Sequence, residues 1–468
     1  MEEFRRYMYT IHKNKSTSDA YINYMPKIQK WLIENSVVEK DFDIWKNIDL
    51  IDQINERLST THKKEWRQLN KIRNGWYGSP WNLWTKFNKR ESSITEIATD
   101  LFLQCLIKTK PFVLLAGISG TGKSRLTRKL AYQFNNIERD RKSRIHPPSN
   151  FKLVKVKPNW HDSSELLGYE SRISGKDRYV VTDFMRFLVK AHQYPNTPFI
   201  VCLDEMNLAP VEHYFAEYLS AVETRRVLGD RIVSDSLISQ EIFEKYHSRK
   251  DDDDPKNEFW KDLKVDDESL QGELLEKGLT IPDNLIVIGT VNMDETTHSF
   301  SRKVLDRAMT IEMNEIEFNE GLIAENDDWS YPEDPIPAES ILPEFTKGSE
   351  VYNELGENGP KIISYLEALN ICLLGTPFQI AYRVRDDFLL YAYNYSRIES
   401  RPDDWLKQVL DDMTLMKVLP RIEGDEDKTI VLDKLKTFLE GKQLGRSLKK
   451  VEEMNERRIK SHFTSFWP

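Results

Sequence analysis

Residues Gly117–Ser124 follow the pattern GxxxxGK[ST] of a phosphate-binding loop. The loop comes directly after the apolar run Phe112–Ala116 and before a helical stretch, Arg125–Phe134, which is the strand–loop–helix context that the pattern requires. Glycines let the loop wrap closely around phosphates, and the helix N-terminus adds positive potential. The residues expected to contact the phosphates are Gly117, Ser119, Gly120, Thr121, Gly122, Lys123 and Ser124.

Two side chains of this loop would take part in the chemistry. The Lys123 ammonium is expected to reach the β- and γ-phosphates of a nucleotide, and the Ser124 hydroxyl is expected to ligate Mg²⁺. A chance glycine turn is the alternative, but the flanking strand and helix argue against it. The pattern therefore predicts a nucleoside triphosphate site with Mg²⁺.

A pair of carboxylates follows about 80 residues later in the chain. The stretch Phe199–Glu205 is an apolar strand that ends in Asp204 and Glu205. An acid at the carboxyl end of such a strand lies beside the phosphate loop in parallel sheets. We expect Asp204 to hold the metal and Glu205 to polarise the attacking water. The alternative is a pair of solvated acids at a strand end.

A polar amide ends a further apolar run, Leu285–Asn292. Asn292 is placed to orient water or to contact the γ-phosphate. The alternative is that Asn292 caps the segment that follows it.

Arginines come next, in the stretch Ser301–Ala308. Either Arg307 or Arg302 could enter the site of a neighbouring subunit as an arginine finger, with Arg307 preferred. The alternative is a surface ion pair with Asp306 or Glu312.

These residues need a sheet to bring them together. From about residue 95, short apolar runs alternate with amphipathic segments, a pattern typical of an α/β fold with a parallel sheet. Long polar interruptions occupy residues 225–280 and 312–339, and the pattern is mainly helical after Gly359. The four clearest buried strands are Phe112–Ala116, Phe151–Val156, Phe199–Leu203 and Leu285–Val291.

Residues 1–94 differ in composition and are expected to form a small, mainly helical domain. Apolar residues recur at helical spacing in 20–34, and basic residues alternate with aromatic ones in 61–90. Lys and Arg can bind nucleic-acid phosphates while Trp and Tyr stack on bases, so this stretch could bind DNA. The alternative is that its tryptophans belong to a core. The basic residues are Lys63, Lys64, Arg67, Lys71, Arg73, Lys86, Lys89 and Arg90.

Composition bounds the class of protein. The chain has 468 residues and a net charge of −9, with 39% hydrophobic residues, which rules out wholesale disorder. No apolar run has the roughly 20 residues that a membrane span needs, and three scattered cysteines predict neither a disulfide framework nor a zinc cluster. We expect an intracellular, cytoplasmic protein without membrane contact.

The order of phosphate loop, Asp-Glu strand, Asn-ended strand, arginine and helical segment resembles the AAA+ NTPases. More closely, it resembles the McrB-type branch, the NTPase subunits of modification-dependent restriction systems. The resemblance covers about Thr95–Trp467, most of the chain. The stretches that carry it are Leu203–Phe215, Gly289–Glu295, Tyr382–Val384, Pro158–Trp160, Leu166–Tyr169 and Phe463–Trp467.

This resemblance implies an AAA+ core with insertions over 95–357 and a C-terminal helical lid over 358–468. It also implies assembly as a ring, expected to be a hexamer, that acts with a separate nuclease of McrC type. Arg383 resembles the lid arginine that touches the γ-phosphate, and a salt bridge within the lid is the alternative. In one respect the chain departs from the family: its best-known members have an arginine shortly after the Asn-ended strand, and Val291–Glu295 has none. These members prefer GTP, but no guanine-reading group is evident in this sequence, so both GTP and ATP stay open as substrates.

The expected function is a GTPase or ATPase motor that drives or licenses a partner nuclease on DNA in anti-phage defence. No nuclease signature is evident in the chain, so cleavage would come from the partner. The alternative is an AAA+ remodeller of a protein complex, with the N-terminal domain as a protein-binding adaptor. Stimulation of hydrolysis by DNA, with salt-dependent affinity, distinguishes the two.

Overall fold

The computed structural model describes most of the chain after residue 100 and a short part before it. The chain divides into two compact units, Met1–Ser93 and Ile94–Pro468. The basic and aromatic stretch 61–90 lies outside the described residues. The described residues are 15–34, 37–38, 54, 58, 101–173, 177–247, 258–293, 298–314, 330–332, 334–398 and 401–467.

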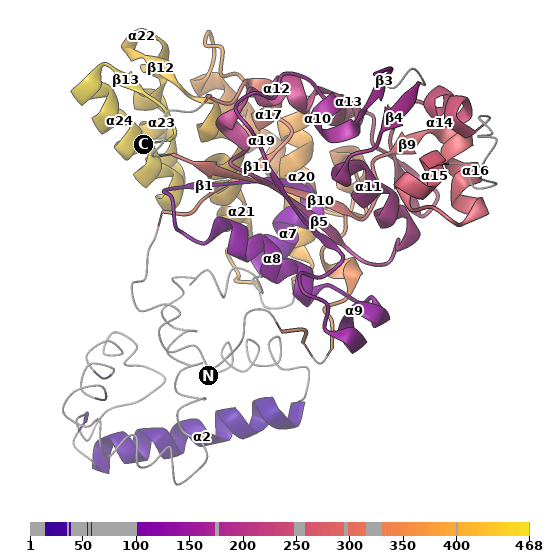
Figure 1. The fold of residues 1–468 in the computed structure, drawn as a ribbon. Helices are drawn as coiled ribbons and strands as arrows, with labels where there is room; N and C mark the ends of the chain where they lie inside the picture. Colours follow the sequence, from indigo (N-terminus) through magenta and orange to yellow (C-terminus); the bar gives the residue numbers. More distant parts are fainter. Residues whose placement is uncertain are drawn as a thin grey trace. The chain divides into compact units, whose positions relative to one another are not determined.

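A parallel five-stranded sheet forms the centre of the second unit, in the order β11-β1-β10-β5-β2 (Figure 1). The four strands expected from the sequence are present, and β11 is a fifth that sequence reasoning missed. The strands are β1 Phe112–Gly117, β2 Phe151–Lys155, β5 Phe199–Asp204, β10 Leu285–Asn292 and β11 Met309–Glu312.

Alternate residues of the sheet face two separate cores, because successive side chains of a strand point to opposite faces. On β1, Phe112 and Leu114 pack into one core, while Val113 and Leu115 pack into the other. The face with Val113 is covered by α7, α8 and the C-terminal helices, and the opposite face by α11, α12 and α13 (Figure 1). These covering helices are α7 Leu101–Thr109, α8 Lys123–Gln133, α11 Asp183–Gln193, α12 Val211–Tyr214 and α13 Ala216–Glu223.

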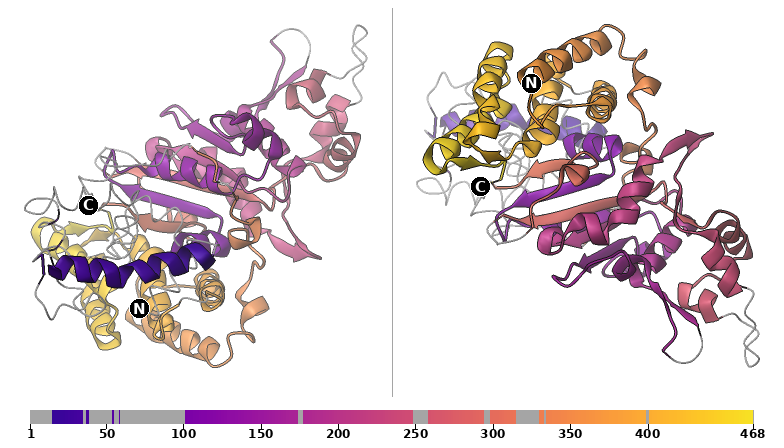
Figure 2. Two further views of the ribbon diagram at one scale, coloured as in Figure 1. Left: turned by 90° about the horizontal axis from the view of Figure 1, so that it is seen from below. Right: turned by 90° about the horizontal axis from the view of Figure 1, so that it is seen from above.

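The polar interruption at 225–280 is folded over most of its length. Its helices share an aromatic cluster, in which Phe243 lies 5.8 Å from Phe259 and 6.0 Å from Trp260 between ring centroids. Figure 2 shows these helices at the opposite end of the unit from the C-terminal helices. The elements are the antiparallel pairs β6–β7 (Arg226–Leu228, Arg231–Val233) and β8–β9 (Ser236–Ile238, Leu279–Thr280), with α14 Gln240–His247, α15 Glu258–Leu263 and α16 Glu268–Lys277.

Helices dominate after β11, as the sequence indicates. They share one continuous core with the face of the sheet that α7 and α8 cover. A turn of π-helix, η4 (Thr414–Val418), continues directly from α21. The main elements are α18 Gly348–Val351, α19 Asn358–Cys372, α20 Tyr382–Ser396, α21 Trp405–Met413, the 3-10 turn η5 Leu419–Arg421, α23 Val431–Lys442 and α24 Gly445–Ser461.

The first unit contains one long described helix, α2 (Lys15–Glu34). Met25, Ile28 and Leu32 recur at helical spacing on it and are fully buried, which confirms the helical pattern predicted for 20–34. Among the described residues, no helix is both long and apolar enough to cross a membrane.

Candidate nucleotide site

The phosphate loop connects β1 to α8 and has the backbone shape that its glycines predict. Gly120 and Gly122 have φ values of 86° and 78°, in the left-handed region that glycine adopts without strain. At Gly117 an added Cβ would lie 2.2 Å from the carbonyl oxygen of Met313, so only glycine lets the loop pass the end of β11. The sequence pattern is therefore a geometric requirement of this loop.

Lys123 begins α8, and its side chain lies inside the loop with 5% exposure. Its ammonium donates hydrogen bonds to the carbonyl oxygens of Gly117 and Ile118, at 3.0 and 2.7 Å. The positive charge is thus already held within the loop by its backbone. A bound triphosphate would compete with these carbonyls for the ammonium.

Ser124 and Asp204 meet beside the loop, although 80 residues separate them in the chain. The Ser124 hydroxyl donates a hydrogen bond of 2.6 Å to Oδ1 of Asp204. Asp204 is the last residue of β5, and Ser124 lies in the first turn of α8. The structure therefore brings together the two residues expected to hold the metal.

A residue that sequence reasoning missed joins this pair. Thr290 on β10 has 2% exposure, and its hydroxyl donates a hydrogen bond of 2.9 Å to Oδ1 of Asp204. The same hydroxyl accepts a hydrogen bond of 3.0 Å from the backbone N–H of Glu205. Thr290 therefore orients both carboxylate residues. The sequence did contain a signal for this role, because Thr290 is a hydroxyl residue in an otherwise apolar strand. It comes two positions before Asn292, so the two side chains lie on the same face of the strand.

Glu205 follows β5 in an unusual backbone conformation. Its φ and ψ are 54° and 50°, in the left-handed region that residues other than glycine adopt at a cost of roughly 1–3 kcal/mol. Such strain persists where surrounding contacts enforce it, and it is concentrated at functional sites. The hydrogen bond that the Glu205 N–H donates to the Thr290 hydroxyl is one such contact.

Asn292 ends β10 directly opposite Gly117 in the parallel pairing of β10 with β1. The next residue, Met293, donates its N–H to the carbonyl oxygen of Gly117 at 3.2 Å. The chain of Asn292 therefore leaves the sheet at the first residue of the phosphate loop. Residues 294–297, which include part of the stretch where the expected arginine is missing, lie outside the described residues.

Two of the three predicted arginines form a second group, centred on the carboxylate of Glu223. Arg307 and Arg383 both contact one carboxylate oxygen of Glu223, and Arg307 also donates to the carbonyl oxygen of Leu219 at 2.9 Å. Burial lowers the pKa of Arg307 from its ordinary value, and the nearby Glu223 carboxylate opposes this shift. Arg307 thus pairs with Glu223, which lies 84 residues away in the chain, rather than with the acids near it in sequence.

Arg302 and Arg383 contact different partners. Arg302 donates a hydrogen bond of 2.7 Å to the carbonyl oxygen of Pro377 and lies 5.2 Å above the ring of Phe378. Arg383 lies at the start of α20 and also approaches Asp306, at 3.9 Å. Both of these partners, Glu223 and Asp306, lie outside residues 358–468, so these contacts differ from the salt bridge within the lid that was the alternative to a phosphate contact.

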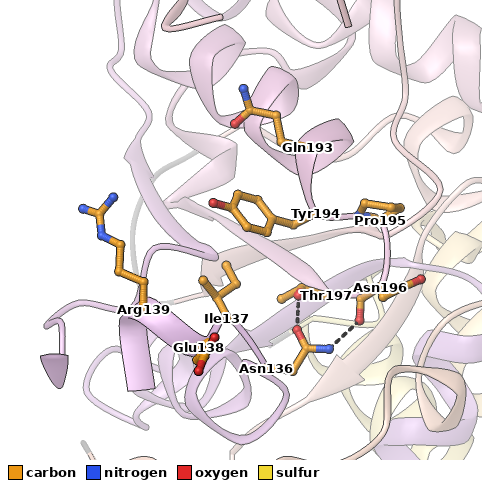
Figure 3. A pocket seen from close by; sticks show the side chains of 9 residues that line it. All are labelled: Asn136, Ile137, Glu138, Arg139, Gln193, Tyr194, Pro195, Asn196 and Thr197. Atoms are coloured by element: carbon orange, nitrogen blue, oxygen red, sulfur yellow. Dashed lines mark hydrogen bonds between the residues drawn. The ribbon is translucent and has the colours of Figure 1, made fainter. Parts of the chain in front are cut away.

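A surface cavity of about 410 Å³ lies away from this group of residues (Figure 3). Its lining comes from the turn after α8, the start of α9 (Glu138–Ser143), the end of α11 and the loop that leads into the amino end of β5. Asn136 and Thr197 line it and are hydrogen-bonded to each other, and Asn136 also donates to the carbonyl oxygen of Asn196 at 2.9 Å. None of the predicted site residues lines this cavity.

The position of Thr290 generates a prediction. Thr290→Val preserves the shape of the side chain but removes both hydrogen bonds, so Asp204 and Glu205 lose a common support. We expect nucleotide hydrolysis to slow by about 10- to 100-fold, the usual effect of removing a group that orients metal-site residues. Nucleotide binding measured by fluorescence should persist, and Thr290→Ser should restore most of the rate. Equal rates for Thr290→Val and the wild type would contradict this role.

Comparison with known proteins gives a family model and similar solved structures. Residues 340–463 match a family model described as "Domain of unknown function (DUF8727)". No curated protein sequence matches the chain. Among solved structures, the chain is similar to the crystal structure of a "putative ATPase" from Cytophaga hutchinsonii, with 15% sequence identity and a TM-score of 0.39. That match covers 68% of this chain and 80% of the other.

Proposed function

We propose that the chain is an AAA+ nucleoside triphosphatase that binds a Mg²⁺–nucleotide complex at the Gly117–Ser124 loop. The observation that carries this proposal is the 2.6 Å contact between the Ser124 hydroxyl and Asp204 at the end of the sheet where the loop begins. A chance glycine turn would not place a hydroxyl and a carboxylate side by side at its exit. The α/β fold with a parallel sheet supports the same conclusion.

The residues present fit Mg²⁺. This ion prefers oxygen ligands and keeps several waters, so one hydroxyl, one carboxylate and the nucleotide phosphates suffice. Ser124 and Asp204 would hold it. When bound, Mg²⁺ neutralises charge on the phosphate oxygens. In the described residues, no cluster of three or more His, Cys, Asp or Glu side chains suits a different metal site.

The remaining residues would act on the phosphates and on water. Lys123 would leave the carbonyls of the loop and bind the β- and γ-phosphates. Glu205 would accept a hydrogen bond from the attacking water, and Asn292, opposite Gly117, would orient that water or the γ-phosphate. Arg307 would stabilise the charge that develops in the transition state at the neighbouring subunit's site, with Arg302 as the second candidate.

We further propose that the protein forms a ring, a hexamer, of the McrB-type branch. In this role it uses GTP or ATP to drive or license a separate nuclease of McrC type on DNA, as part of anti-phage defence. Support comes from the sequence resemblance over about 95–467 and from the basic and aromatic composition of 61–90. The alternative function is that of a remodeller of protein complexes. It would be favoured if residues 61–90 made no contribution to DNA binding.

Two substitutions test the nucleotide site. Lys123→Ala removes the charge at the β- and γ-phosphates, and nucleotide affinity should fall by about 10- to 150-fold, corresponding to roughly 1.5–3 kcal/mol. Glu205→Gln should bind nucleotide normally but hydrolyse it about 10²- to 10⁴-fold more slowly. Fluorescent-nucleotide binding and phosphate release measure these effects. Glu217→Gln, which changes an exposed acid on α13, is the matched control. Unchanged binding by Lys123→Ala would contradict the assignment of the loop.

A second experiment tests the proposed DNA contact. Alanine at Lys63, Lys64, Lys71 and Arg73 should weaken duplex binding and reduce the slope of log K against log salt by up to about 0.9 for each lost phosphate contact. Stimulation of hydrolysis by DNA should fall in parallel. A control variant with the same change in charge carries alanine at Lys428, Lys436, Lys442 and Lys460, and it should retain the wild-type slope. Equal slopes for both variants would favour the protein-binding role of residues 1–94.

A further inference from the structure

Lys417, in the π-helical turn η4, is fully buried and bound to one short segment of the core. Its ammonium donates to the carbonyl oxygens of Leu305, Asp306 and Ala308, at 3.1, 3.0 and 2.8 Å. An ammonium has three N–H donors, and these three carbonyls share them with the carboxylate of Asp387. These carbonyls lie on both sides of Arg307, in the turn between α17 (Arg302–Leu305) and β11.

A buried carboxylate balances this charge. Asp387 on α20 lies 3.0 Å from the Lys417 ammonium and 2.6 Å from that of Lys110. Burial alone would raise the pKa of Asp387, but the two ammonium groups outweigh burial and hold the pKa below its ordinary value. Lys110 also donates to the carbonyl oxygen of Asp306, at 3.3 Å. The Leu305–Ala308 turn is thus bound by two cations that share one anion.

Arg307 is therefore held at two points. Its backbone is fixed from the side of the C-terminal helices by Lys417, and its guanidinium contacts Leu219 and Glu223 from α13. The guanidinium contacts can be exchanged, because Glu223 is partly exposed, with 36% of its side chain accessible. The contacts of Lys417 are inaccessible to solvent. The backbone around Arg307 is thus more firmly fixed than the Arg307 guanidinium.

We propose that Lys417 is a positioning residue that fixes the Leu305–Ala308 turn, so that Arg307 is presented correctly to the nucleotide site of the neighbouring subunit. This inference rests on the proposed function, since it requires Arg307 to act on a neighbour. Misplacing a catalytic group by about 1 Å can cost about 10²-fold in rate. Loss of the Lys417 contacts should therefore impair the arginine that a subunit donates, while its own nucleotide site keeps working.

Lys450 on α24 provides a matched comparison. It is also buried, and its ammonium lies 2.6 Å from both carboxylate oxygens of Glu312. Glu312 accepts a hydrogen bond of 2.7 Å from Asn314, whose own oxygen accepts the N–H of Ile118 at 3.2 Å. Lys450 is thus connected to the phosphate loop of its own subunit. Both lysines are buried ammonium groups paired with a carboxylate. Lys417 supports the turn that carries Arg307, whereas Lys450 supports the phosphate loop.

The experiment mixes subunits in pairs. One tester, Lys123→Ala, has an intact Arg307 but a defective phosphate loop, and the other tester, Arg307→Ala, has the opposite defect. Lys417→Met should bind nucleotide with wild-type affinity and lose about 10- to 100-fold in kcat. Mixed with Lys123→Ala it should regain activity, and mixed with Arg307→Ala it should not. Lys450→Met should regain activity with Arg307→Ala instead. Native mass spectrometry confirms that mixed assemblies form.

The inference would be overturned if Lys417→Met recovered activity with the Arg307→Ala tester or failed to recover it with the Lys123→Ala tester. Loss of its nucleotide binding, or a wild-type kcat, would overturn it as well. If the two testers fail to complement each other, the proposed role of Arg307 fails instead, so the two failures are distinguishable. Lys417→Met removes the donor to three buried carbonyls and leaves Asp387 paired only with Lys110, so the variant should be less stable than the wild type. Should Lys417→Met not fold, Lys417→Gln carries the test, since its amide retains two N–H donors and should give an intermediate kcat. If neither variant folds by circular dichroism, Lys417 is purely structural and the inference is wrong.

Discussion

The candidate site depends on the parallel pairing of β10 with β1 on one side and with β5 on the other. In this register Asn292 lies opposite Gly117, and Gly289 lies opposite Leu203, the residue before Asp204. All three strands therefore end at the same edge of the sheet. A shift of one residue would turn the side chains of β10 to the opposite face, and Thr290 would no longer reach Asp204.

Polar contacts at that edge of the sheet fix the positions of the candidate catalytic and metal-binding residues. Ser124 and Thr290 both donate to the same oxygen of Asp204, so this carboxylate is fixed from a helix and from a strand. Thr290 also holds the backbone of Glu205 in its left-handed conformation. Such preorganisation matters for catalysis, because a group already in place does not need to reorganise as charge develops. The C-terminal helices extend the same principle to the turn that carries Arg307.

Much of this arrangement could be predicted from the sequence because it is local. Apolar runs indicated four strands, and glycine spacing indicated the shape of the loop between β1 and α8. The fifth strand, β11, was missed because Met309–Glu312 is short, contains Thr and Glu, and leads into an acidic stretch. The folded insertion was read only as polar, since its aromatic cluster joins residues from separate short helices.

The contacts that could not be predicted are those between distant residues. Glu223 lies 84 residues from Arg307 and 160 from Arg383, and no spacing rule connects them. Lys417 lies more than 100 residues after the turn that it supports, and in the sequence it is one lysine in an ordinary amphipathic stretch. Thr290 is the intermediate case. A hydroxyl in a buried strand was visible in the sequence, but its partners depend on the order of strands in the sheet.

The most direct test of the account is a structure of the assembled protein with Mg²⁺ and a non-hydrolysable GTP or ATP analogue. The account predicts that the triphosphate lies in the Gly117–Ser124 loop, with Mg²⁺ between the phosphates and the side chains of Ser124 and Asp204. It also predicts that Arg307 leaves Glu223 and reaches the γ-phosphate bound by the adjacent subunit. A triphosphate bound elsewhere, or an Arg307 that stays on Glu223 within its own subunit while the neighbouring site is filled, would contradict it.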